Sequence, residues 1–256
     1  MRLRVLGCSG GVSRDRRTTC FLLDDDTLID CGTGVGELSL EEMSRLRHIF
    51  LTHTHLDHIA GLPLLIDTLY RQLEAQPLTV HALPESCETL KRHIFNWQIW
   101  PDFFSLPEAD HAAAHFETLD FGEVCEIENG RRLEMIRVNH TVPTAGYFVT
   151  QGDSSFAFSG DTTTNDSLWD FLNAKGRLDL LLMECAFSNE ERQLSEVAKH
   201  YCPDTLSEDI AKLQLHPQLA ISHLKPGDED RTLEELRVAL PGFEPRPLRG
   251  GEVFEL

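Results

Sequence analysis

Positive charge is scarce in this chain of 256 residues, which has 23 lysines and arginines against 42 aspartates and glutamates and a formal net charge of −19. A surface of this sign repels polyanions, so we expect no binding of extended nucleic acid through counterion release. Long apolar runs are missing too: no stretch approaches the roughly 20 residues of a membrane span, and MRLRVLGCSGG has no signal-peptide core. We therefore expect no membrane association.

The cysteines and glycines lack the spacing of common cofactor motifs. The seven cysteines form no CxxC pair, and an odd, unpatterned set predicts reduced thiols and a cytoplasmic protein. The glycines Gly32, Gly34 and Gly36 do not have the GxGxxG spacing of a dinucleotide fingerprint. A Rossmann-type nucleotide site is therefore disfavoured.

Strand-like and helix-like patterns alternate through both halves of the chain. Apolar runs such as HIFLTH and LDLLLMECA predict buried strands, while IAGLPLLIDTLYRQL and PDTLSEDIAKLQL have apolar residues at helical spacing. No linker or repeat divides the sequence. We expect one domain over residues 1–256, an α+β fold with two sheets covered by outer helices, and an aromatic-rich insert at about residues 91–115.

The segment LTHTHLDHIAG, residues 51–61, has four potential metal ligands close together: His53, His55, Asp57 and His58. Histidine and carboxylate suit zinc, manganese and iron. Side chains alternate in an extended segment, so His53 and His55 point to the same side, whereas His58, next to Asp57, points elsewhere. Because four such close ligands cannot all bind one ion with good geometry, the segment predicts two ions that share the loop.

Three further candidate ligands directly follow apolar strands. His140 ends LEMIRVNH, Asp161 ends FAFSGD and His223 ends LAISH, and a strand end is a rigid place from which a side chain enters a site. His111 and His115 of HAAAH have i, i+4 spacing, but they lie in an irregular segment, and we expect a solvated surface pair. The remaining histidines have no ligand neighbours and are expected to be packing or surface residues: His48, His81, His93 and His216.

The motif THTHLDH, taken with the three later residues, resembles the metallo-β-lactamase superfamily, a four-layer αββα sandwich that binds two metal ions at one edge of its sheets. The resemblance covers essentially the whole chain and implies that Asp161 bridges the ions. Asp30 of the early DCGTG is then expected to support a ligand rather than to be one. The implied ligands are His53, His55 and His140 for the first ion, and Asp57, His58 and His223 for the second.

The block LLMECAFSNEERQLSEVAKHYCPDTL resembles the matching part of ribonuclease Z and its phosphodiesterase relatives, where a glutamate and a histidine form an acid pair. The corresponding residues are Glu184 and His200. A ribose oxygen is a poor leaving group, so a protonated histidine speeds its departure, and the carboxylate fixes the imidazole tautomer. The alternative to this catalytic pair is that the histidine lies on the surface and that the buried glutamate is satisfied by hydrogen bonds from the backbone. The chain departs from ribonuclease Z at Tyr201, where that family has a small hydroxyl residue.

HTHLDHIAGLPLLID is similar to the signature of class II cyclic nucleotide phosphodiesterases, and FNWQIWPDFFSLP is similar to the insert that these enzymes carry beside the active site. Its rings, among them Trp97, Trp100 and Phe103, are candidates to stack on a purine. The alternative is a local hydrophobic cluster or a dimer contact. Lys225, two residues after His223, is the best candidate for a phosphate contact, ahead of the loop arginines Arg14, Arg16 and Arg17.

These resemblances imply a hydrolase with two divalent metal ions, Zn²⁺ before Mn²⁺ or Fe²⁺, that converts a 3′,5′-cyclic nucleotide such as cAMP or cGMP to the nucleoside 5′-monophosphate. The catalytic residues are then His200, Glu184 and Asp57, and the family resemblance predicts a homodimer. Three alternatives stay open. One is a ribonuclease Z-like tRNA 3′-processing endonuclease, which the net charge of −19 disfavours. The others are a thioester or lactone hydrolase, which does not need His200, and a non-catalytic metal-binding or nucleotide-sensing module.

Overall fold

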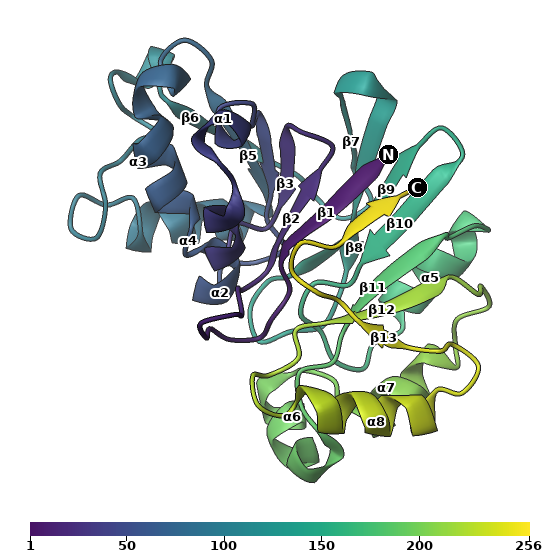
Figure 1. Ribbon diagram of the computed structural model, residues 1–256. Helices are drawn as coiled ribbons and strands as arrows, with labels where there is room; N and C mark the ends of the chain where they lie inside the picture. The colour runs from purple at the N-terminus through teal and green to yellow at the C-terminus, as the bar shows by residue number, and fades with distance from the viewer.

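The computed structural model describes residues 1–256 as two seven-stranded sheets with helices on their outer sides (Figure 1). The first sheet has the order β14-β1-β2-β3-β4-β5-β6 and the second the order β13-β12-β11-β10-β9-β8-β7. The strands of the first sheet are β1 Arg2–Gly7, β2 Cys20–Leu23, β3 Thr27–Ile29, β4 His48–Phe50, β5 Leu78–Ala82, β6 Ala114–Thr118 and β14 Val253–Glu255. Those of the second are β7 Val124–Ile127, β8 Arg131–Arg137, β9 Ala145–Gln151, β10 Ser154–Phe158, β11 Leu180–Glu184, β12 Gln218–Ser222 and β13 Arg246–Pro247.

Both sheets join an antiparallel half to a parallel half in the same way. In the first sheet, β14, β1, β2 and β3 pair antiparallel, and β3, β4, β5 and β6 pair parallel. In the second, β7, β8, β9 and β10 pair antiparallel, and β10, β11, β12 and β13 pair parallel. Parallel strands end at the same edge of a sheet, so the loops that follow them gather there.

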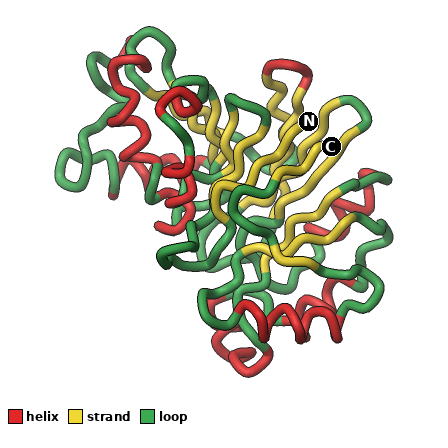
Figure 2. The backbone as a smooth tube through the Cα atoms, in the orientation of Figure 1, coloured by secondary structure: helices red, strands yellow, loops and turns green.

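Helices cover the outer face of each sheet, and Figure 2 shows them, in red, on two sides of the strands. Residues of α3 and α4 pack on the first sheet, and residues of α5, α7 and α8 pack on the second. None of the helices is long and apolar enough to cross a membrane. Their bounds are α1 Leu40–Met43, α2 Leu56–Ile59, α3 Leu62–Leu73, α4 Pro84–His93, α5 Ser167–Lys175, α6 Arg192–Ala198, α7 Pro203–Ile210 and α8 Glu229–Ala239.

Three apolar cores separate these four layers. Side chains alternate along a strand, so Phe21 and Leu23 of β2 enter the core between the sheets, whereas Leu22 enters the core under the outer helices. Phe156 and Phe158 of β10 enter the inter-sheet core from the opposite side. Because both faces are covered, the strands are apolar on both faces. The predicted αββα sandwich is confirmed.

The aromatic-rich segment is shorter than the predicted span of residues 91–115. Residues 91–93 complete α4, and residues 114–115 begin β6, so the irregular part runs between them. His111 lies in a short 3-10 turn and His115 in β6, and both are exposed. The two histidines therefore share no helix, although each is solvated as expected.

Candidate active site

The structure brings all seven predicted ligands together at the ends of strands. His53 and His55 lie in the loop after β4, Asp57 and His58 lie in the short helix α2 that follows it, and the others follow β8, β10 and β12. Ligand atoms of His53, His55, His140 and Asp161 lie within 4.8 Å of one another, and so do those of Asp57, His58, Asp161 and His223. The two groups share Asp161, as the resemblance implies. The seven residues are therefore arranged as two adjacent positions with one common carboxylate.

One oxygen of Asp161 is the centre of this arrangement. Its Oδ2 lies 3.2 Å from Nε2 of His58, 3.4 Å from that of His223, 3.6 Å from that of His53 and 4.0 Å from that of His140. Asp161 is 1% exposed, so its carboxylate has lost almost all contact with water. Four imidazole nitrogens thus surround one buried carboxylate oxygen, at the point where the two groups meet.

The donors on these residues fit divalent metal ions. The Nε2 atoms of His53 and His58 and the Oδ1 atom of Asp161 are buried and have no well-oriented hydrogen-bond partner in the protein. Buried polar atoms without partners are costly, and they are rare in native proteins unless an ion or water satisfies them. Imidazole and carboxylate are also the ligands that zinc, manganese and iron accept.

The ring orientations of His58 and His140 are fixed by hydrogen bonds on the far side of each ring. Asp30, directly after β3, lies 2.7 Å from Nδ1 of His58 and also accepts from the hydroxyl and backbone N–H of Thr52. The expectation that Asp30 supports a ligand therefore agrees with its geometry. Nδ1 of His140 lies 2.9 Å from the carbonyl oxygen of Lys199. Such partners select the tautomer that leaves Nε2 free for an ion.

The backbone near the centre is held in uncommon conformations. Asp30 and His223 have φ of 57° and 64°, in the left-handed region that residues other than glycine seldom adopt. Gly32 of DCGTG packs so closely that an added Cβ would lie 2.2 Å from the carbonyl oxygen of Asp57. The DCGTG segment thus supplies a partner for His58 and a close support for the ligand loop.

Glu184 and His200 form the predicted pair beside the two positions. Nδ1 of His200 lies 3.0 Å from Oε1 of Glu184. The same carboxylate accepts from the backbone N–H groups of Thr162, Tyr201 and Ala186. Glu184 is therefore held by backbone as well as by the histidine. The alternative of a surface histidine is wrong, because His200 is only 8% exposed.

His200 stands directly against the ligands. Its ring stacks on that of His223 at 5.2 Å between centroids and meets the ring of His140 edge-on at 5.0 Å. Burial by itself lowers the pKa of His200, but the charge and hydrogen bond of Glu184 outweigh it and leave that pKa above its ordinary value. Glu184 therefore favours the protonated form of this imidazole.

The predicted phosphate contacts divide between two places. Nζ of Lys225 donates to the carbonyl of Gly10 at 2.7 Å and lies 5.7 Å from the ring of Phe187, which in turn meets His200 edge-on. Two donors of the ammonium group remain for a ligand. The loop arginines lie elsewhere, in a separate cavity.

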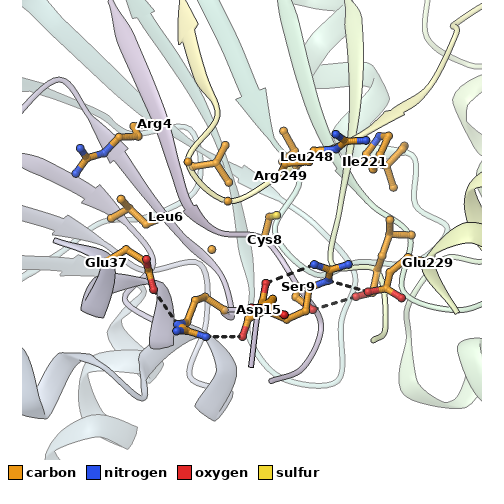
Figure 3. Close-up of a pocket in the computed structure, with 18 of the residues that line it drawn as sticks. Arg4, Leu6, Cys8, Ser9, Asp15, Glu37, Ile221, Glu229, Leu248 and Arg249 are labelled. Atoms are coloured by element: carbon orange, nitrogen blue, oxygen red, sulfur yellow. Dashed lines mark hydrogen bonds and ion pairs between the residues drawn. The ribbon is translucent and has the colours of Figure 1, made fainter. Parts of the chain in front are cut away.

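That cavity, of about 850 Å³, lies beside the strand ends and contains none of the seven predicted ligands (Figure 3). Cys8, Ser9 and Arg249 are among its lining residues. Arg16 and Arg17 also line it and are paired with carboxylates, Arg16 with Glu229 at 2.8 Å and Arg17 with Glu37 at 2.9 Å. Their charges are largely offset, so Lys225 is the better-placed cation for the active site.

The aromatic insert is mainly a packing element. Phe103 is 4% exposed and packs on Tyr70 of α3 at 5.3 Å between ring centroids, which favours the hydrophobic-cluster alternative for this ring. Trp100 is partly buried against the same core. Trp97 is 64% exposed. Of the three rings predicted to contact substrate, Trp97 is the one whose faces are most available.

Comparison with known proteins agrees with this geometry. A family model described as a beta-lactamase superfamily domain matches residues 26–240. The chain is 26% identical over 166 residues to a ribonuclease Z of Halorubrum lacusprofundi, and this alignment covers 60% of this chain and 48% of that protein. It is 21% identical over 272 residues to a probable 3′,5′-cyclic-nucleotide phosphodiesterase of Yersinia pestis, which covers 87% of this chain and 77% of that protein. The crystal structure of unliganded yeast PDE1 superposes with a TM-score of 0.82 at 18% identity, over 100% of this chain and 99% of that one.

The chain therefore belongs to the metallo-β-lactamase superfamily and is a hydrolase of that superfamily. This fold binds divalent metal ions, and the two groups of histidine and aspartate around Asp161 are the residues of this chain that fit them.

Proposed function

We propose that the protein is a phosphodiesterase with two divalent metal ions, Zn²⁺ first among the candidates, that opens the ring of 3′,5′-cyclic nucleotides and gives nucleoside 5′-monophosphates. The observation that carries the proposal is the contact of the Glu184–His200 pair with the ligand rings of His140 and His223. A hydrolase of esters with good leaving groups has no need of an acid at this place. The named phosphodiesterase relative adds support.

We assign one ion to His53, His55, His140 and Asp161 and the other to Asp57, His58, Asp161 and His223. When bound, such a pair of ions activates water and offsets the charge of the phosphoryl group. Asp57 is the least buried of the carboxylates, with a side chain 28% exposed, and its Oδ2 lies 3.6 Å from Nε2 of His223. It is the group placed to accept the proton of the attacking water.

His200 acts as the general acid. Its Nδ1 is bonded to Glu184, so Nε2 is the atom from which a proton reaches the leaving 3′ oxygen. A positioned acid contributes about 10²–10⁴-fold to rate when the leaving group is an alkoxide. Lys225 binds a phosphate oxygen, and the exposed ring of Trp97 stacks on the base of the nucleotide.

The ribonuclease Z alternative has a specific support in the Halorubrum relative and would use the same acid pair. The net charge of −19 disfavours it, because a transfer RNA brings many phosphates to the protein surface. A small cyclic nucleotide brings one phosphate, which two ions and Lys225 can offset. The charge of the surface is therefore the feature that separates the two candidates.

A turnover panel decides between the candidates. The zinc- or manganese-loaded protein is assayed with cAMP, cGMP, 2′,3′-cyclic nucleotides, a precursor transfer RNA and a thioester. We expect kcat/KM to be highest for a 3′,5′-cyclic nucleotide and the product to be the 5′-monophosphate. Cleavage of precursor transfer RNA at a higher kcat/KM would establish the nuclease, and preferred turnover of the thioester would remove the phosphodiesterase proposal.

A further inference from the structure

A second cluster of metal-binding side chains lies away from the active site. His81 of β5, Glu117 of β6 and Cys125 of β7 have ligand atoms within 4.8 Å of one another, and none of the three belongs to either group around Asp161. β6 and β7 are the terminal strands of the two sheets. The expectation that His81 has no ligand neighbours is therefore wrong, because the register of β5 with β6 places Glu117 opposite it.

A hydrogen-bond chain controls the orientation of His81. Its Nε2 lies 3.0 Å from Nδ1 of His48, and Nε2 of His48 lies 3.0 Å from a carboxylate oxygen of Glu128. A carboxylate only accepts, so the arrangement in which Nε2 of His48 donates to Glu128 leaves Nδ1 of His48 to accept from the Nε2–H of His81. Burial, with the charge of His48 as a smaller cause, lowers the pKa of His81 to about 3, so this ring is neutral near pH 7.

These hydrogen bonds leave the lone pair of His81 on its Nδ1 atom. That atom lies 3.6 Å from Oε2 of Glu117 and 3.9 Å from Sγ of Cys125. A histidine whose far nitrogen donates to a fixed acceptor is the arrangement that orients metal ligands in proteins. His81 is 1% exposed, so its ring cannot turn away into solvent.

The spacing suits a tetrahedral ion. Zinc ligands at about 2.0–2.3 Å from the ion lie about 3.4–3.6 Å from one another at tetrahedral angles. The two separations from Nδ1 of His81 are wider than this by a few tenths of an ångström at most. Rotation of Glu117, whose side chain is 57% exposed, can supply the first shift, and rotation of the half-buried Cys125 side chain can supply the second. One thiol, one imidazole and one carboxylate form a donor set that suits zinc.

We propose that His81, Glu117 and Cys125 hold a third zinc ion, with water as the fourth ligand. Binding releases the proton of the Cys125 thiol to solvent and forms the sulfur–zinc bond. Since the ligands come from β5 and β6 of one sheet and β7 of the other, the ion ties the two sheets together at this end of the sandwich. Its role is structural, and it takes no part in turnover.

Cobalt substitution tests the site by a signal that the active site cannot give. All seven candidate ligands of the active site, Asp161 included, offer nitrogen or oxygen, so a thiolate-to-cobalt charge-transfer band requires a cysteine ligand. We expect Co²⁺-loaded protein to show this band, Cys125→Ser to abolish it, and the matched control Cys8→Ser, at another half-exposed cysteine, to keep it. Absence of the band from the wild-type protein, or its survival in Cys125→Ser, would overturn the proposal.

Zinc content gives a second readout. After dialysis against zinc, Cys125→Ser should bind one equivalent fewer than the wild-type protein, and Glu117→Gln, at an exposed side chain that folding does not require, should weaken binding of that equivalent at least about tenfold. A cooperative melt and the remaining zinc equivalents verify that each variant is folded. Equal zinc content and affinity in all three proteins would show a hydrogen-bonded cluster without a metal.

Discussion

The two sheets have the same order of antiparallel and parallel strands, yet they supply the active site in different ways. The first sheet contributes its four predicted ligands from the loop after β4 and the short helix α2 that continues it. The second contributes one residue after each of β8, β10 and β12, together with the proposed acid pair, Glu184 at the end of β11 and His200 after α6. One half of the molecule thus concentrates its ligands in sequence, and the other brings them together only by folding.

The contrast is sharpest for two aspartates at corresponding places. Asp30 follows β3 and Asp161 follows β10, and each of these strands begins the parallel half of its sheet. The two carboxylates approach opposite nitrogens of the same ring, Asp30 at 2.7 Å from Nδ1 of His58 and Asp161 at 3.2 Å from Nε2. Equivalent positions therefore have different roles, because one carboxylate meets a single ring and the other meets four.

Asp161→Asn should have the largest effect. Loss of the shared carboxylate charge weakens both metal positions, and two bound ions supply several kcal/mol of transition-state stabilisation, so we expect turnover to fall by about 10³-fold or more. Metal content and kcat are measured on the same preparation. Full metal content in this variant would exclude Asp161 as the bridge.

His200→Ala tests the acid supplied by the second half. We expect both active-site ions to remain and kcat for a 3′,5′-cyclic nucleotide to fall by about 10²–10⁴-fold. An activated aryl phosphodiester, whose leaving group needs no proton, is the control substrate and should lose much less. Equal losses on the two substrates would contradict the acid assignment.

Asp30→Asn should have a smaller effect than Asp161→Asn, although both residues contact His58. Removal of a carboxylate that orients a ligand lowers metal affinity by about 10–100-fold. A metal titration of this variant is compared with Asp25→Asn, an exposed aspartate near the β2–β3 turn, which should bind metal as the wild-type protein does. Equal losses for Asp30→Asn and Asp161→Asn would remove the distinction between the two aspartates.

Trp97→Ala should have the smallest effect on turnover. An exposed ring that stacks on a base contributes about 1 kcal/mol, so we expect KM for the cyclic nucleotide to rise about fivefold without loss of stability. Phe103→Ala is the contrasting variant in the same insert. Its ring is buried, so we expect it to cost about 3–5 kcal/mol of stability, read from denaturant unfolding. If KM rose in the folded Phe103→Ala variant and not in Trp97→Ala, Phe103 would be the ring that contacts the base and Trp97 would not.

Residues close in sequence were the most predictable part of the site. Alternation along an extended segment already separates His53 and His55 from His58, and strand ends mark His140 and Asp161. The carbonyl of Lys199 was beyond such reasoning, because a backbone group has no residue-type signal. The cluster of His81 was equally hidden, since only strand register and sheet packing bring positions 81, 117 and 125 together.

The turn at Lys199 has one further consequence. This residue caps the C-terminus of α6 with φ of 55°, its carbonyl holds Nδ1 of His140, and the next side chain is that of His200, the proposed acid. One peptide unit thus connects the orientation of a metal ligand to the position of a proton donor. By thermodynamic reciprocity, any change that metal binding at His140 makes in substrate affinity through this peptide equals the change that the substrate at His200 makes in metal affinity.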